Sequence, residues 1–130
     1  MLKLMLRAAI CLAIPLLLNA QVETQATAIL RKNCIPCHSA QAKMGGLILE
    51  TRAGALQGGA SGSPAIVPHA ASRSAMLEKI NTNKMPPGNP LAAADRQILA
   101  RWIDEGAPWS APVISTVQEQ IGRASCRERV

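Results

Sequence analysis

The chain has 130 residues, 48% of them hydrophobic, and contains two Trp but no Phe or Tyr. Its formal charge is +6, but residues 21–119 hold nine Lys or Arg against seven Asp or Glu, a net charge of +2. This nearly balanced charge gives no reason to expect binding to nucleic acid or to an anionic membrane surface. About a hundred residues make one small domain, and only its two Trp offer the aromatic rings that usually supply much of a small core's buried area.

Residues 1–20 have the pattern of a secretory signal peptide. Lys3 and Arg7 supply the positive start, residues 8–18 form an apolar run, and Ala20 ends a small-residue cleavage site. The apolar run is shorter than a typical membrane span. We therefore expect a periplasmic or otherwise exported protein, associated with a membrane only if the segment is retained as an uncleaved anchor.

A short helix is expected over residues 24–33, with Thr24 as its N-cap. It leads into a C-x-x-C-H run formed by Cys34, Cys37 and His38, which is the attachment pattern of a c-type haem. Two cysteines at this spacing form thioethers with the two haem vinyl groups, and the adjoining histidine becomes the proximal iron ligand. One covalently bound haem c would also give the aromatic-poor core an apolar surface to pack on.

Residues 39–67 form a glycine-rich connector in which apolar residues recur. We expect an ordered loop that wraps the haem, with a helical turn over 52–56; a flexible surface loop is the alternative.

Two further helices are expected over residues 72–81, with Ser72 as the N-cap, and over 93–105. Gly106 follows the second helix where a C-terminal cap belongs. Trp102 lies on the apolar stripe of that helix, and its N–H needs a partner such as a haem propionate. The predicted fold class is mostly α.

The loop between these two helices contains Met85, followed by two prolines, and we predict that Met85 is the distal iron ligand. A thioether is a soft, neutral donor, and a His/Met pair raises the reduction potential of haem iron. The prolines favour a fixed loop over a core helix. The alternatives are that Met85 merely fills the core, or that His69 is the ligand, although a lone loop histidine is usually solvated. Met76 is expected to pack in the core.

These motifs resemble the planctomycete-type cytochrome c domain. The resemblance implies a small cytochrome c-like helical domain wrapped around a covalently attached haem, with thioethers at Cys34 and Cys37 and iron ligation by His38 and Met85. His69 and the two alanines after it depart from the usual pattern of that loop. The resemblance covers nearly all of residues 33–109 in separate blocks: the C-x-x-C-H run, Lys43-Met44-Gly45-Gly46-Leu47, Gly58-Gly59, Pro64-Ala65-Ile66-Val67-Pro68, Met85-Pro86-Pro87 and Trp102-Ile103-Asp104 with Gly106-Ala107-Pro108-Trp109.

The last residues, Ile121 to Val130, resemble the translation of a short-read sequencing adapter. We therefore interpret 120–130 as an adapter-derived artefact, excluded from the fold like any other scar; a genuine basic tail is the alternative. The expected organisation is a signal peptide at 1–20, a cytochrome c domain at 21–110, and the start of a linker at 111–119. Proteins with this domain are commonly longer, so we expect further domains after the linker.

The predicted function is one-electron transfer by an exported mono-haem c-type cytochrome, which is not itself an enzyme. Its partner would be a redox protein or a downstream domain of the same chain. A haem peroxidase or gas sensor with an open or labile sixth iron position is the main alternative. A haem-free thiol oxidoreductase would need a βαβ pattern that the sequence lacks. A zinc site formed by Cys34, Cys37, His38 and His69 would have poor ligand spacing.

Overall fold

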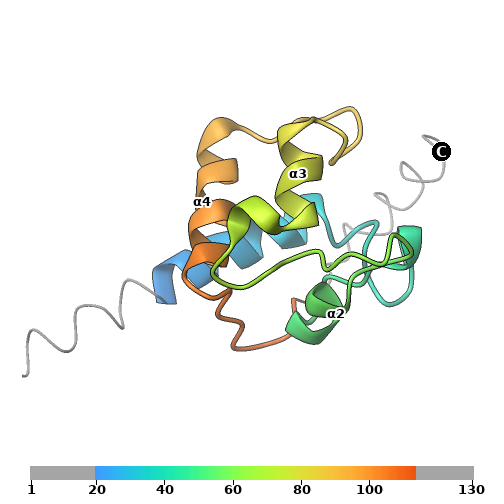
Figure 1. The fold of residues 1–130 in the computed structure, drawn as a ribbon, viewed down its shortest axis with the longest axis horizontal. Coiled ribbons are helices and arrows are strands. Elements are labelled where there is room, and N and C mark those ends of the chain that lie inside the picture. The colour runs from blue at the N-terminus through green and yellow to red at the C-terminus, as the bar shows by residue number, and fades with distance from the viewer. Residues whose placement is uncertain (1–19, 114–130) are drawn as a thin grey trace, which may run out of the picture.

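The structure is a computed structural model, and it describes residues 20–113 (Figure 1). Nearly all of the predicted signal peptide, the later part of the predicted linker and the adapter-like tail lie outside the described residues. Among those residues, no helix is long and apolar enough to cross a membrane.

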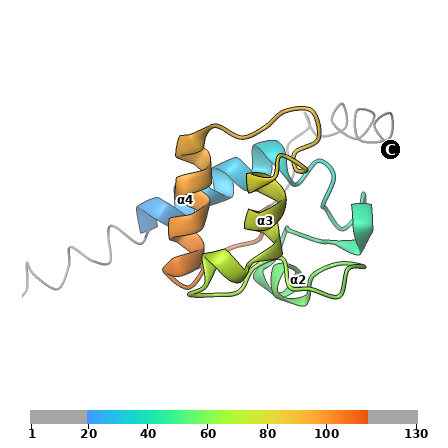
Figure 2. The same cartoon turned by 45° about the horizontal axis from the view of Figure 1, so that its top comes forward.

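The described chain contains helices and no strand, which confirms the mostly α class. A helix over 20–33 passes behind α3 and α4 in both views (Figures 1 and 2), and α3 and α4 lie side by side in front of it. The other elements are η1 (Met44–Gly46), α2 (Arg52–Gln57), η2 (Ala71–Arg73), α3 (Ala75–Asn81) and α4 (Ala93–Asp104).

The helix over 20–33 includes Thr24 in its interior, so the prediction that Thr24 is the N-cap was wrong. The Thr24 hydroxyl instead donates to the Ala20 carbonyl, 2.8 Å away. Val22, Ala26 and Leu30 recur every four residues and are buried. This spacing places them on one face, which packs into the core and fixes the direction in which the helix delivers the haem motif.

The glycine-rich connector is ordered and packed, as predicted. The Thr51 side chain caps α2 by accepting a hydrogen bond from the Gly54 N–H, and the predicted helical turn is confirmed. The N–H of Ala60 donates to the Gly45 carbonyl at 2.8 Å, which joins the two glycine-rich stretches. Ile66 is fully buried. The connector is therefore one wall of the domain.

Helix α3 begins at Ala75, three residues later than predicted, because residues 71–73 form the separate 3-10 turn η2. Ser74, rather than Ser72, precedes the helix. Its hydroxyl accepts from the Val67 N–H at 2.9 Å and donates to the Ala70 carbonyl at 3.1 Å. The buried serine thus ties the connector to η2, a tertiary role that a capping pattern does not encode.

Helix α4 matches its prediction to within one residue at its C-terminus. Gly106 has φ 97°, and the N–H groups of Gly106 and Ala107 donate to the carbonyls of Ile103 and Trp102. This pair of bonds is a Schellman cap, as predicted for the glycine. The Trp102 indole N–H donates to the Pro108 carbonyl at 2.9 Å. The Trp102 N–H therefore has a main-chain partner six residues away and not the haem propionate that we expected.

The packed chain continues past α4 to Val113, whereas the sequence predicted a linker from residue 111. Val113 is 1% exposed and its N–H donates to the Glu50 carbonyl at 2.8 Å. The Glu23 carboxylate accepts hydrogen bonds from the backbone N–H and the hydroxyl of Ser110. Val113 thus packs against the domain, whereas residues 111 and 112 are exposed; the domain boundaries stay predictions.

Candidate functional site

The C-x-x-C-H motif forms a tight turn directly after the helix over 20–33. The Cys34 N–H donates to the Leu30 carbonyl at 2.8 Å, and the His38 N–H donates to the Cys34 carbonyl at 2.9 Å. Ile35 is fully buried and anchors the turn in the core. The turn therefore holds both cysteines and the histidine in fixed positions relative to the helix.

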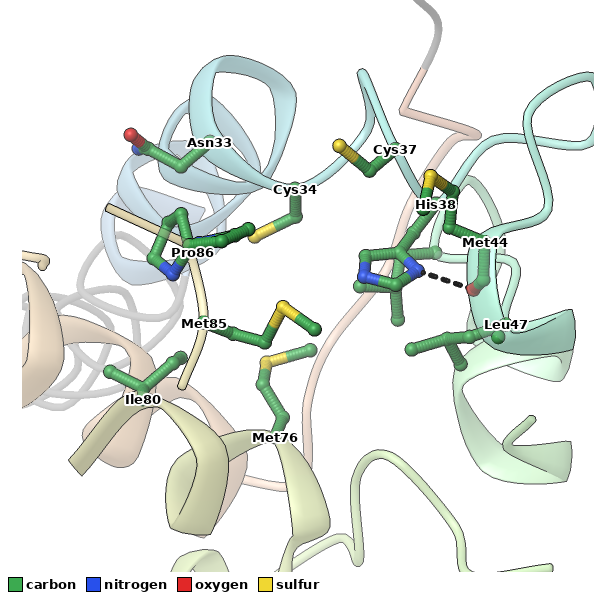
Figure 3. A pocket seen from close by; sticks show the side chains of 13 residues that line it. Asn33, Cys34, Cys37, His38, Met44, Leu47, Met76, Ile80, Met85 and Pro86 are labelled. Atoms are coloured by element: carbon green, nitrogen blue, oxygen red, sulfur yellow. Dashed lines mark hydrogen bonds between the residues drawn. The ribbon is translucent and has the colours of Figure 1, made fainter. Parts of the chain in front are cut away.

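The motif opens onto a pocket of about 300 Å³. Figure 3 shows the His38 ring and the Met85 side chain pointing into this space from opposite sides. The pocket is lined mostly by apolar groups, and its lining residues are Asn33, Cys34, Cys37, His38, Met44, Gly45, Leu47, Leu49, Met76, Ile80, Met85, Pro86 and Pro87. All four predicted haem-site residues are therefore brought together around one cavity.

His38 is oriented by the chain that follows it. Its Nδ1 lies 3.0 Å from the Met44 carbonyl oxygen. A carbonyl only accepts, so Nδ1 carries the proton and Nε2 keeps its lone pair. Burial lowers the pKa of the imidazole, against the smaller opposing effect of hydrogen bonds to the Met44 and Leu47 backbone. A neutral ring with a free Nε2 lone pair is the form that binds a metal.

The two motif cysteines are not bonded to each other, because Cys34 is a free thiol. Cys34 is half-buried on the wall of the pocket, and desolvation raises its pKa to about 12. Attachment of a haem would require both sulfurs as reduced thiols.

Met85 is 39% exposed, and it is the one large hydrophobic side chain of the described residues that is classed as exposed. Its N–H donates to the Lys79 carbonyl at the end of α3, 3.1 Å away. Met76, 8% exposed on the same helix, also lines the pocket. An exposed thioether at the mouth of an apolar pocket gains burial when a flat apolar group occupies the space.

The residues present fit a haem. The pocket has an apolar lining, cysteine sulfurs and an imidazole on one wall, and a thioether on the other. Those two walls would supply the attachment points and both axial ligands that haem iron uses. Cys34, Cys37, His38 and Met85 would hold the group.

The competing sites receive no support. His69 is not among the pocket residues; its Nδ1 faces the Asp104 carbonyl at 3.0 Å, at the end of α4. Within residues 20–113, no group of three or more His, Cys, Asp or Glu side chains could hold a metal ion. This argues against the zinc site. The absence of strands from the same residues argues against a thioredoxin-like fold.

Sequence reasoning missed two features of the site. The Met44 carbonyl that orients His38 is a main-chain group, so no residue type marks it. Met76 was expected to pack in the core, and its burial confirms this, but it also lines the haem pocket. Met76 lies four residues before Ile80, another lining residue, so the two share one face of α3. This spacing is the sequence signal that could have placed Met76 at the pocket.

A small helical domain with a C-x-x-C-H turn and an apolar pocket above it is the architecture of a c-type cytochrome. Residues 34–89 match the family model described as Planctomycete cytochrome C, so this region of the chain is similar to that family. The match includes the haem motif and Met85 and ends before α4. Comparison with curated proteins and with solved structures finds no match.

Proposed function

We propose that this chain is an exported cytochrome domain that carries one haem and transfers single electrons through an iron held by His38 and Met85. The observation that supports it most strongly is the convergence of Cys34, Cys37, His38 and Met85 on one apolar pocket. These residues come from the turn after the first helix and from the loop after α3, so the fold, not sequence proximity, brings the two ligands together.

Each residue has a separate role in this proposal. Cys34 and Cys37 form the thioethers that retain the group, and His38 offers the Nε2 lone pair that its bond to Met44 leaves free. Met85 would bind the iron from the other wall of the pocket, and with both ligands in place the iron would have no open position for a substrate. A bound haem supplies the one-electron chemistry of its iron.

The apolar lining has a second consequence for function. Leu47, Leu49 and Ile80 surround the site with side chains that exclude water. Solvent exclusion and a thioether ligand both influence the potential of haem iron, and the thioether raises it. The proposal is therefore an electron carrier without turnover of its own. Its partner would be a redox protein, or a later domain of a longer chain.

A haem peroxidase or gas sensor is the second candidate, because Met85 is 39% exposed and lies on an exposed loop. A ligand on such a loop leaves the iron more easily than one held in the core. Carbon monoxide binding by the reduced protein and peroxide turnover would favour this candidate. An unreactive iron in both states favours electron transfer.

The proposal is tested by producing the full chain in a host that exports it and attaches c-type haem. We expect the mature protein to exceed its polypeptide mass by one haem, to stain for haem on a denaturing gel, and to titrate reversibly with one electron. Cys34→Ala combined with Cys37→Ala should abolish the stain. A purified chain whose mass equals that of the polypeptide alone would refute the proposal.

A further inference from the structure

The loop that carries Met85 starts from a closed helix end. Asn83 has φ 57°, and its N–H donates to the Ile80 carbonyl at 3.1 Å, while the Lys84 N–H donates to the Lys79 carbonyl at 2.9 Å. These two bonds form a Schellman cap with asparagine in the left-handed position. The backbone of Met85 is thus set two residues after the cap, and its conformation depends on how Asn83 is held.

One guanidinium contacts both ends of this loop. Arg96, in the first turn of α4, donates from Nη2 to the Asn83 side-chain oxygen at 2.8 Å and from Nε to the Leu91 carbonyl at 2.9 Å. Asn83 opens the loop after α3, and Leu91, 5% exposed, closes it before α4. The two bonds therefore fasten both ends of the loop to the same side chain in the first turn of α4. We name this arrangement the Arg96 clamp.

The residues between the two ends have little burial of their own. Residues 83–90 are exposed except for Pro86, which is half-buried. Segments with few buried contacts open most easily. A bond at each end of such a segment limits the range over which the Met85 sulfur moves, although neither bond touches the sulfur.

We propose that Arg96 is a positioning residue for the Met85 thioether, acting through Asn83 and Leu91, and that it slows replacement of Met85 on the iron by external ligands. This inference rests on the proposed ligation of iron by Met85. The planar fork of arginine reaches two acceptors at fixed angles, which a lysine ammonium does not do. The geometry of the group, and not its charge alone, is therefore what the loop requires.

The experiment uses the oxidised haem-loaded protein and measures the rate at which cyanide replaces the methionine. Replacement requires the loop to open, so Arg96→Gln should raise the rate about tenfold, the loss expected for partly exposed charge-assisted hydrogen bonds. Arg96→Lys should give most of the same increase because it cannot form both bonds. Arg101→Gln is the matched control, since Arg101 lies on the same helix but pairs with Glu105, and should leave the rate unchanged.

Two variants separate positioning from general destabilisation. Asn83→Gly permits the same left-handed backbone and removes the whole side chain, including the oxygen that Arg96 contacts. It should raise the rate, and adding Arg96→Gln to it should increase the rate by less than the factor that Arg96→Gln gives alone. Ile103→Val removes one core methylene from α4, where Ile103 is fully buried, and lowers stability without touching the loop. It should leave the cyanide rate unchanged, while hydrogen exchange of the Met85 amide should rise only in the clamp variants.

Equal rates in Arg96→Gln and the wild type would overturn the inference, as would an equal increase in Ile103→Val. A different result is expected if Met85 does not bind the iron at all. In that case the wild-type protein itself would lack the far-red absorption band of a methionine–iron(III) bond and would bind cyanide without a loop-opening step.

Discussion

The Nδ1 atom of His38 and the carbonyl oxygen of Met44 lie 3.0 Å apart, six residues apart in sequence. The contact depends on a tight path of the chain. The Met44 N–H donates to the Cys37 carbonyl at 3.0 Å, and the Leu49 N–H donates to the His38 carbonyl at 2.7 Å. The segment after the motif therefore curls back and presents a main-chain acceptor to the ring, so the backbone specifies which nitrogen faces the pocket.

The first prediction concerns the proximal ligand. His38→Gly should abolish the six-coordinate spectrum of the haem-loaded protein, because it removes the Nε2 donor while the thioethers keep the haem in place. Added imidazole should restore the spectrum by occupying the space left by the side chain. His69→Ala is the control and should leave the spectrum unchanged, since His69 is not among the pocket residues. If His69→Ala lost the six-coordinate spectrum and His38→Gly kept it, the iron ligand would be His69 and not His38.

The sequence singled out the residues that meet at the pocket where they belong to short local motifs; their roles as haem ligands stay predictions. The C-x-x-C-H run and the Met-Pro-Pro loop are short patterns, and the structure brings them to one pocket as expected. The end of α4 was also predictable, because Gly106 at φ 97° supplies the conformation that a Schellman cap needs. In these places local sequence and tertiary structure agree.

Prediction failed where a side chain serves a distant partner. Ser74 looked like a helix residue, but its hydroxyl bonds Val67 and Ala70, and this favours a 3-10 turn before α3. Trp102 was assigned a cofactor contact, yet it bonds the Pro108 carbonyl. Arg96 belongs to none of the sequence motifs. Its acceptors, an asparagine 13 residues away and a main-chain carbonyl, carry no pattern that a sequence reveals.

The second prediction concerns the distal ligand. Met85→Ala should remove the far-red band of the oxidised haem-loaded protein and lower its reduction potential, because the thioether raises that potential. Met76→Leu, a swap of similar volume in the same pocket, should keep the band and cost less than about 1.5 kcal/mol in stability. Absorption spectroscopy with a redox titration distinguishes the two variants. If Met76→Leu lost the band and Met85→Ala kept it, the assignment would pass to Met76.

The third prediction concerns the reactivity of Cys34 in the folded, reduced chain before haem attachment. Burial raises the pKa of this thiol from the ordinary value of 9.0 to about 12. Only the thiolate is alkylated, so at pH 8 iodoacetamide should react with Cys34 much more slowly in the folded chain than in urea. Peptide mass mapping after timed quenching measures both rates. Equal rates would mean that Cys34 is not buried before haem is attached.

The same shift has a defined sign for stability. The folded state favours the protonated thiol, so its contribution to the free energy of unfolding is fully present below pH 9.0 and is lost as the pH rises toward about 12. Urea unfolding of the reduced chain should therefore show a falling midpoint in that alkaline range. In Cys34→Ala the urea midpoint should fall less over this pH range, because the Cys34 thiol no longer contributes to the decrease. An unchanged pH profile in that variant would contradict the assignment.

The fourth prediction tests the cap of α4 with two glycines. Gly106 and Gly62 both have positive φ, 97° and 75°. A Cβ on Gly106 would lie 2.8 Å from Cε1 of His69, whereas one on Gly62 would meet nothing within 4 Å. Gly62→Ala should cost about 1–2 kcal/mol, the penalty of a left-handed alanine. Gly106→Ala should cost more, because the imidazole must also move.

Urea unfolding of both variants gives the comparison, and a third variant isolates the clash. In a His69→Ala background the extra cost of Gly106→Ala should disappear, and the remaining cost should approach that of Gly62→Ala. The double-mutant cycle is informative because a Cβ added at position 106 would contact the His69 ring, so the two effects should not be additive. Additive costs would show that His69 does not limit the space at the end of α4, and that the strain lies in the backbone alone.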